Sequence, residues 1–174
     1  MKVIRPSTPY GWVTFCDDIR QEIGGKVTAV GIYNSYLYYR ETPPLHIPKL
    51  AMRISYLEEE GESTEPVSVK VIVLQGDEQQ IIIEEVLIPD RKNVAEVFDG
   101  ARKQMETMGI KKDPDSRIAL QALKHFEISP FPIFGPCKVV VRAYRGDEEI
   151  RLGALSILPG PDVVPPPTPS PPTA

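Results

Sequence analysis

The sequence is poor in the residues that build metal sites and disulfide scaffolds, and it has no long apolar run. Two cysteines and two histidines occur among 174 residues, and no two of these four stand at metal-ligand spacing. The longest apolar stretches fall far short of the roughly 20 residues that a bilayer-spanning helix needs. The first residues contain no apolar segment typical of a secretory signal. We therefore expect a cytoplasmic protein in which Cys16 and Cys137 are free thiols, with a stabilising disulfide between them as the alternative.

The sequence also lacks the charge and the motifs of several functional classes. With 24 acidic and 20 basic residues the net charge is −4, so there is no basic excess to attract a phosphate backbone. No glycine-rich turn joins a strand to a helix, which disfavours a nucleotide-binding α/β fold. Cys16 beside His46 or His125 is the one nucleophile–base pair that the sequence leaves open. These absences predict a protein that is not an enzyme, holds no cofactor or metal, and binds neither nucleic acid nor membrane.

What the sequence does contain is β-structure. Within residues 50–57, every second side chain is large and apolar (Leu50, Met52, Ile54 and Tyr56), so one face is apolar with the period of a strand. Two pairs of β-branched runs flank Gly-Asp turns and predict hairpins: 67–73 with 81–88, and 138–144 with 150–158. Further strands are expected at 12–15, 26–33, 36–39 and 117–128, the last of which also fits a helix.

One segment, residues 93–109, is predicted to be helical. Its apolar side chains recur at spacings of three and four: Val94, Val97, Phe98, Ala101, Met105 and Met108. Asn93 with Glu96 fits an N-cap and capping box, and Gly109 fits a left-handed C-cap. We expect this amphipathic helix to pack its apolar side on the sheet or on a partner.

These elements predict a mainly β protein, an antiparallel two-sheet sandwich of immunoglobulin-like or C2-like type with one amphipathic helix. Residues 1–158 would form a single domain, with the helix as an insert near 93–109. The last 16 residues, 159–174, contain eight prolines and few apolar side chains. They predict a disordered proline-rich tail with polyproline-II character and two P-x-x-P motifs.

The segment between the first two strands looks the most functional. It combines charged residues with a glycine pair: Asp17, Asp18, Arg20, Glu22, Gly24 and Gly25. Either aspartate would cap a single helical turn that buries Ile19 and Ile23. The glycines would end that turn with positive φ, and Arg20 would pair with Asp17 or Glu22.

The string F-C-D-D-I-R-Q-E-I-G-G-K, residues 15–26, is followed by Val30-Gly31-Ile32-Tyr33. It resembles the N-terminal signature of an uncharacterised bacterial and phage protein family, a domain of unknown function. The step Ser129-Pro130-Phe131 before the last hairpin is similar to the C-terminal half of that family. The resemblance covers most of residues 10–158. It implies a bacterial or phage-borne source, and it implies no activity, ligand or catalytic residue.

The one aromatic cluster consists of Tyr33, Tyr36, Tyr38 and Tyr39. Alternation along a strand predicts that Tyr36 and Tyr38 share one face and that Tyr39 lies on the other. Exposed tyrosines are frequent anchors of protein interfaces, although neighbouring segments would equally cover such a face. We take these four residues as candidate protein-binding residues.

Three functional hypotheses follow. The first is a non-enzymatic β-sandwich module that binds a protein partner or a second copy of itself. The second is a structural or accessory protein of a phage capsid or tail, located in the virion and tethered by the proline-rich tail. The third is a calcium-binding C2-like domain with four aspartates in predicted connections as ligands: Asp17, Asp18, Asp77 and Asp147. Gly-Asp pairs are equally common in ordinary hairpin turns, including the turn that spells Arg145-Gly146-Asp147.

Overall fold

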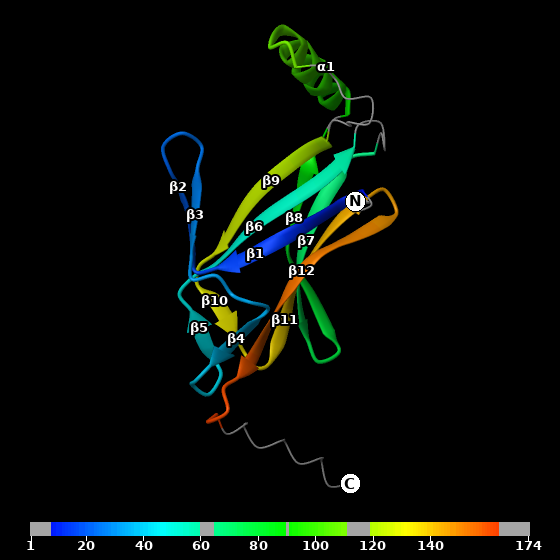
Figure 1. Ribbon diagram of the computed structural model, residues 1–174. Helices are drawn as coiled ribbons and strands as arrows, with labels where there is room; N and C mark the ends of the chain where they lie inside the picture. Colours follow the sequence, from blue (N-terminus) through cyan, green and yellow to red (C-terminus); the bar gives the residue numbers. More distant parts are fainter. Residues whose placement is uncertain (1–7, 60–64, 90, 111–118, 164–174) are drawn as a thin grey trace, which may run out of the picture.

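The computed structural model describes residues 8–59, 65–89, 91–110 and 119–163. It is mainly β, with one helix and two large sheets packed face to face (Figure 1), which confirms the predicted fold class. One sheet has five strands in the order β4 (Tyr36–Tyr39), β12 (Glu148–Pro159), β11 (Cys137–Arg145), β7 (Val67–Gln75) and β8 (Glu78–Ile88). The other has three: β1 (Tyr10–Cys16), β6 (Leu50–Glu59) and β9 (Ala119–Ile128).

Two short antiparallel pairs complete the described part of the chain. The strands β2 (Asp18–Gln21) and β3 (Val27–Val30) form a hairpin that projects from the sandwich, and β5 (Leu45–Ile47) pairs with β10 (Phe131–Ile133). The described residues therefore form twelve strands, three of which the sequence does not predict. The additional strands have three or four residues each, which is too short for a period to be recognised.

The core is shared by the two large sheets. Strand β6 contributes Leu50, Met52, Ile54 and Tyr56, all with 0% exposure, and β7 contributes Val67, Val69 and Val71 at the same period of two. Both predicted hairpins, β7–β8 and β11–β12, are confirmed. Residues 117–128 contain the strand β9, as the sequence analysis favours.

The two sheets approach most closely where β1 passes β12, and glycine makes this approach possible. A Cβ atom on Gly11 would overlap the carbonyl oxygen of Ser55 and lie 2.7 Å from Cδ2 of Leu152. A Cβ atom on Gly153, which has φ 154°, would lie 2.7 Å from Cγ1 of Val13. The missing side chains let the backbones of the two layers come close, as in other tight strand crossings.

The single helix, α1 (Arg91–Thr107), stands beyond one end of the sandwich (Figure 1). It starts before Asn93, so the predicted N-cap at Asn93 is wrong. The predicted C-cap is correct: Gly109 has φ 68°, and the amide of Ile110 donates to the carbonyl of Met105 at 3.0 Å.

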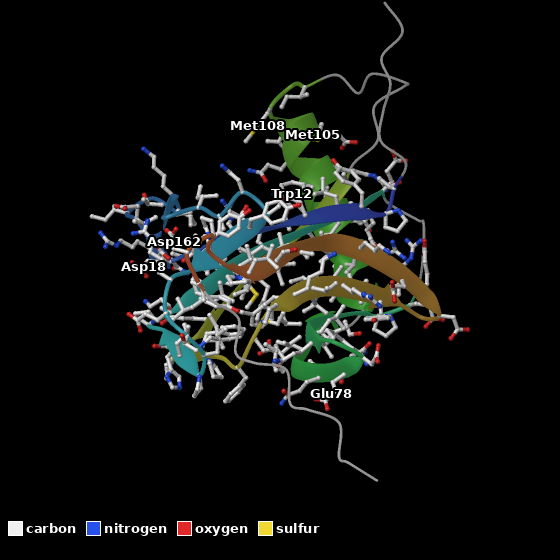
Figure 2. All side chains as sticks on the ribbon, turned by 90° about the horizontal axis from the view of Figure 1, so that it is seen from below. Trp12, Asp18, Glu78, Met105, Met108 and Asp162 are labelled. Atoms are coloured by element: carbon white, nitrogen blue, oxygen red, sulfur yellow. The ribbon has the colours of Figure 1, made fainter. Side chains whose placement is uncertain are left out.

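The apolar side of α1 is only partly covered by the domain. Phe98 is buried and Val94 packs against the core, but Val97 is 59% and Met108 64% exposed. Figure 2 shows Met105 and Met108 on the part of the helix that extends away from the strands. Of the two expectations for this stripe, packing on the sheet therefore holds for Phe98 and Val94 and not for Val97 and Met108, and packing of these two on a partner stays a prediction.

A set of interacting polar side chains connects the two large sheets at one end of the sandwich. Glu58 on β6 is 2% exposed and accepts a hydrogen bond of 2.9 Å from the hydroxyl of Tyr56. The guanidinium of Arg145 on β11 lies 3.7 Å from the same carboxylate and pairs with Glu148 at 2.7 Å. This group links a strand of one sheet to a strand of the other.

At the C-terminal end, the chain stays in contact with the domain past residue 158, where the sequence analysis places the boundary. Strand β12 ends at Pro159, the amide of Gly160 donates to the carbonyl of Tyr39 at 2.8 Å, and Val163 packs against the core. The remainder of the predicted tail, residues 164–174, lies outside the described residues, as do residues 1–7.

Candidate functional site

The segment predicted to be a helical turn is instead the hairpin β2–β3. Asp18 starts a strand that pairs with β3, so neither aspartate caps a helix. Ile23 is 99% exposed at the hairpin tip and is not buried. The predicted positive φ values are correct, at 80° for Gly24 and 76° for Gly25, but these glycines turn the hairpin.

Asp17 connects the base of this hairpin to Tyr33, the first of the four candidate tyrosines. Its amide donates to the carbonyl of Val30 at 3.0 Å, and its carboxylate accepts a hydrogen bond from the hydroxyl of Tyr33. A Cβ atom on Gly31, which has φ 66°, would overlap the Asp17 carboxylate. Burial, together with the hydrogen bond to Asp17, raises the pKa of Tyr33. Tyr33 therefore has a structural role.

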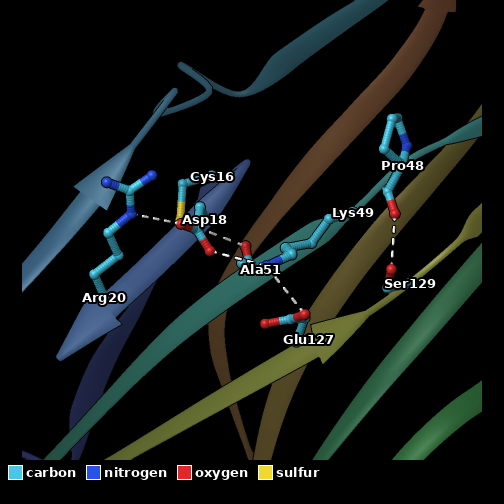
Figure 3. A network of polar contacts seen from close by, with 8 residues as sticks. All are labelled: Cys16, Asp18, Arg20, Pro48, Lys49, Ala51, Glu127 and Ser129. Carbon is cyan, nitrogen blue, oxygen red and sulfur yellow. Dashed lines mark hydrogen bonds and ion pairs between the residues drawn. The ribbon is translucent and has the colours of Figure 1, made fainter.

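Asp18 fastens the same hairpin to the three-stranded sheet (Figure 3). Its carboxylate accepts from Nε of Arg20 at 2.8 Å and from Nζ of Lys49 at 2.9 Å. Lys49 also pairs with Glu127 on β9 at 3.1 Å. Arg20 thus pairs with Asp18, and not with Asp17 or Glu22 as the sequence analysis expects. Glu22 accepts a hydrogen bond of 3.0 Å from the hydroxyl of Thr28 across the hairpin.

These contacts make the attachment of the hairpin dependent on pH. The hydrogen bonds from Arg20 and Lys49 lower the pKa of Asp18 from 3.8 to about 2. Because the folded state favours the charged carboxylate, its stabilising effect is present above pH 3.8 and is lost as the pH falls through about 2. We expect the protection factors of the β2 and β3 amides, which are their NMR exchange rates corrected for the intrinsic pH dependence, to fall over this range. An Asp18→Asn variant should have low protection factors at neutral pH that do not fall further in acid.

The four candidate tyrosines fall into two groups. Tyr39 is 6% exposed and belongs to the core, whereas Tyr36 and Tyr38 are 54% and 60% exposed. The alternation predicted for β4 is thereby confirmed. The rings of Tyr36 and Tyr38 stack with centroids 6.3 Å apart and an angle of 13° between their planes. Tyr36 and Tyr38 thus form a flat aromatic surface on the outer face of the sheet.

Strand β4 lies at the end of the strand order, so only one of its edges is paired with a described strand. It runs parallel to β12, which the sequence analysis does not anticipate. The amide of Ser156 donates to the carbonyl of Ser35 at 2.9 Å, and that of Gly160 to the carbonyl of Tyr39. Since alternate residues of a strand face the same neighbour, the main-chain groups of Tyr36 and Tyr38 face the open edge.

A groove borders this edge where the chain leaves β12. It has a volume of about 520 Å³ and is lined by Tyr38, Arg40, Gly160, Pro161, Asp162 and Val163. The amide of Val163 donates to the carbonyl of Gly160 at 3.0 Å, which closes a turn with Pro161 at its second position. This groove is not predicted from the sequence, because residues 160–163 belong to the segment predicted as a disordered tail. The proline–aspartate pair in the turn is the signal that could have revealed it.

Within the described residues, the side chains considered for catalysis or metal binding do not come together in one site. Cys16 and Cys137 are free, and burial raises the pKa of both thiols. Cys16 is fully buried, and its thiol donates to the carbonyl of Ala51 at 3.8 Å. His125 pairs with Arg53 and lies two residues along β9 from the position that is in register with Cys16, so His125 and Cys16 are not in register. Within the described ranges, no group of three or more His, Cys, Asp or Glu side chains is placed to hold a metal.

The register also separates two of the aspartates proposed as calcium ligands. Strands β7 and β11 are antiparallel neighbours, so their turns at Asp77 and Asp147 lie at opposite ends of the sheet. The Arg-Gly-Asp turn does not display its arginine, because the side chain of Arg145 is 12% exposed and paired with Glu148. No described helix is long and apolar enough to cross a membrane.

No protein-family model matches the sequence, and no curated protein matches it. The interpretation of the site therefore depends on its geometry.

Proposed function

We propose that this chain is a non-enzymatic module that binds another protein through the open edge of β4. The observation that supports the proposal is the combination of an unpaired strand edge with Tyr36 and Tyr38, stacked and more than half exposed. Tyrosine is enriched at the centres of protein interfaces, because a rigid ring buries a large area at low entropic cost. Edge main-chain groups add hydrogen bonds to an extended partner segment. The virion hypothesis stays a prediction, because nothing in the described residues bears on it.

The test is site-specific photo-crosslinking followed by a binding measurement. A photoreactive phenylalanine at position 38 should crosslink the partner, whereas the same residue at position 86 should not. Val86 is the control because it is 56% exposed on β8, the opposite edge strand of the same sheet.

The double variant Tyr36→Ala/Tyr38→Ala should then bind the crosslinked partner at least 10-fold more weakly, on the order expected for loss of interface anchors. A matched control, Ile81→Ala/Val86→Ala, removes two exposed apolar side chains from the opposite edge and should leave binding unchanged. Equal crosslinking at both positions, or unimpaired binding by the tyrosine variant, would contradict the proposal.

A further inference from the structure

The open edge of β4 presents a short pattern of main-chain groups that no described strand uses. On the side that faces β12, the carbonyls of Ser35 and Tyr39 accept hydrogen bonds of 2.9 Å and 2.8 Å. Since alternate residues of a strand face the same neighbour, Tyr36 and Tyr38 each direct one N–H and one C=O to the other side. A strand that pairs with this edge therefore has to offer two donors and two acceptors at a two-residue spacing.

This pattern is complementary to itself. In an antiparallel pair, residues that direct their main-chain groups at each other exchange two hydrogen bonds. A second copy of β4, turned about a twofold axis through Leu37, places its Tyr38 opposite Tyr36 and its Tyr36 opposite Tyr38. Each pair then exchanges two bonds, so every main-chain group on the two open sides is used. A register displaced by one residue places the tyrosines opposite residues whose groups face β12, and one displaced by two pairs only one tyrosine within the strand.

The distribution of charge favours a second copy at this edge. Residues 34–39 read Asn-Ser-Tyr-Leu-Tyr-Tyr and contain no charged side chain, although the chain has a net charge of −4. Charged side chains on an edge strand oppose pairing with a further strand. Strand β8, at the other edge of the same sheet, has this protection in Glu78, Glu84 and Glu85. Two chains of equal net charge can therefore meet along β4 without bringing like charges together.

The side chains of the edge suit the same arrangement. Tyr36 and Tyr38 are stacked on one face of the strand and are more than half exposed. Residues directly opposite in an antiparallel pair lie on the same face, with Cα atoms about 5.5 Å apart where they are hydrogen-bonded. Each ring would thus contact a ring of the second copy. The four tyrosines would cover one another on one face of a continuous sheet of ten strands.

We infer that the partner bound at the open edge is a second copy of this chain, paired antiparallel with β4 about a twofold axis through Leu37. The inference rests on the proposed function, because it names the partner of the same edge. Only two types of residue pair supply main-chain bonds, so the interface is small and the dimer dissociates on dilution.

Two charge variants test the pairing and its register, with the mass measured by sedimentation equilibrium from about 5 μM to about 1 mM. The unsubstituted chain should change from monomer to dimer over this range. Tyr36→Lys/Tyr38→Lys places lysine opposite lysine in both pairs and should weaken dimerisation at least 10-fold. Tyr36→Lys/Tyr38→Glu places lysine opposite glutamate in both pairs and should dimerise at least 10-fold more tightly than the first variant.

The matched control adds the same two charges at the opposite edge of the sheet. Ile81→Lys/Val86→Lys changes exposed side chains of β8 and should leave dimerisation as in the unsubstituted chain. All the substituted side chains are exposed, so the circular dichroism spectra and melting curves at the lowest concentration should agree among the four proteins.

A chain that stays monomeric at every concentration would overturn the inference. So would dimers that tolerate lysine at both tyrosine positions, and so would a lysine–glutamate variant that dimerises no better than the lysine variant. The outcome is separable from that of the proposed function. If the chain is monomeric while position 38 crosslinks a different protein that Tyr36→Ala/Tyr38→Ala no longer binds, the inference fails and the proposed function stands. A monomeric chain without a crosslinked partner contradicts both.

Discussion

Replacement of Arg145 by methionine should lower the free energy of unfolding by about 3 kcal/mol. The carboxylate of Glu58 is buried in the core and lies 3.7 Å from the guanidinium of Arg145. Removal of the guanidinium takes a compensating positive charge away from this buried carboxylate, and the desolvation cost of the carboxylate dominates the effect. Methionine keeps most of the apolar stem, so the loss reports the charge and not the packing.

Urea denaturation of single and double variants tests this prediction. Arg145→Met/Glu58→Gln removes both charges and should recover more than half of the loss, since no uncompensated charge is left in the core. The control Arg151→Met alters an arginine whose side chain is 86% exposed, and it should change stability by less than about 0.5 kcal/mol. A double variant no more stable than Arg145→Met would show that the guanidinium acts through its packing.

Gly11→Ala should be comparably destabilising, by about 3 kcal/mol. The added methyl group would overlap the carbonyl oxygen of Ser55 and lie 2.7 Å from Cδ2 of Leu152. A flexible side chain could rotate away, but the carbonyl belongs to β6, which pairs with β1 along its whole length. The substitution therefore strains the pairing of β1 with β6 and also crowds Leu152 of the opposite sheet.

The matched control is the same substitution where no neighbour obstructs it. Gly100 lies within α1 with no atom near a Cβ position, so Gly100→Ala should stabilise the protein by up to about 1 kcal/mol. Chemical denaturation of both variants should give effects of opposite sign. Tolerance of Gly11→Ala would mean that the contact between β1 and β12 is looser than the structure shows.

The sequence predicts the hairpins well because their determinants are local. In β7–β8 and β11–β12, the turn glycines Gly76 and Gly146 both have φ 57° and stand between runs of alternating apolar residues. The exposure of Tyr36 and Tyr38 is predictable for the same reason, since side chains alternate along any strand. The C-cap of α1 likewise depends on one glycine and its neighbours.

The failures concern contacts between distant residues. Ile19 and Ile23 are four positions apart, which suits a helical turn, but the pairing of β2 with β3 decides the structure. Nothing near Tyr36 shows that β4 pairs in parallel with Ser156 and its neighbours, 120 positions later. The open edge that defines the candidate site is a consequence of that pairing, so local patterns do not reveal it.

The pairing of β4 with β12 also has a consequence for biosynthesis. Residues 36–39 leave the ribosome long before their neighbour β12, which ends at Pro159. Strand β12 also separates β4 from every other strand of that sheet. Loop closure over so many residues slows folding, and nascent β4 cannot join its sheet until β12 has been translated. We expect any folding intermediate that forms on the ribosome to consist of β1, β6 and the early hairpins, with the tyrosine-bearing strand added in the final step.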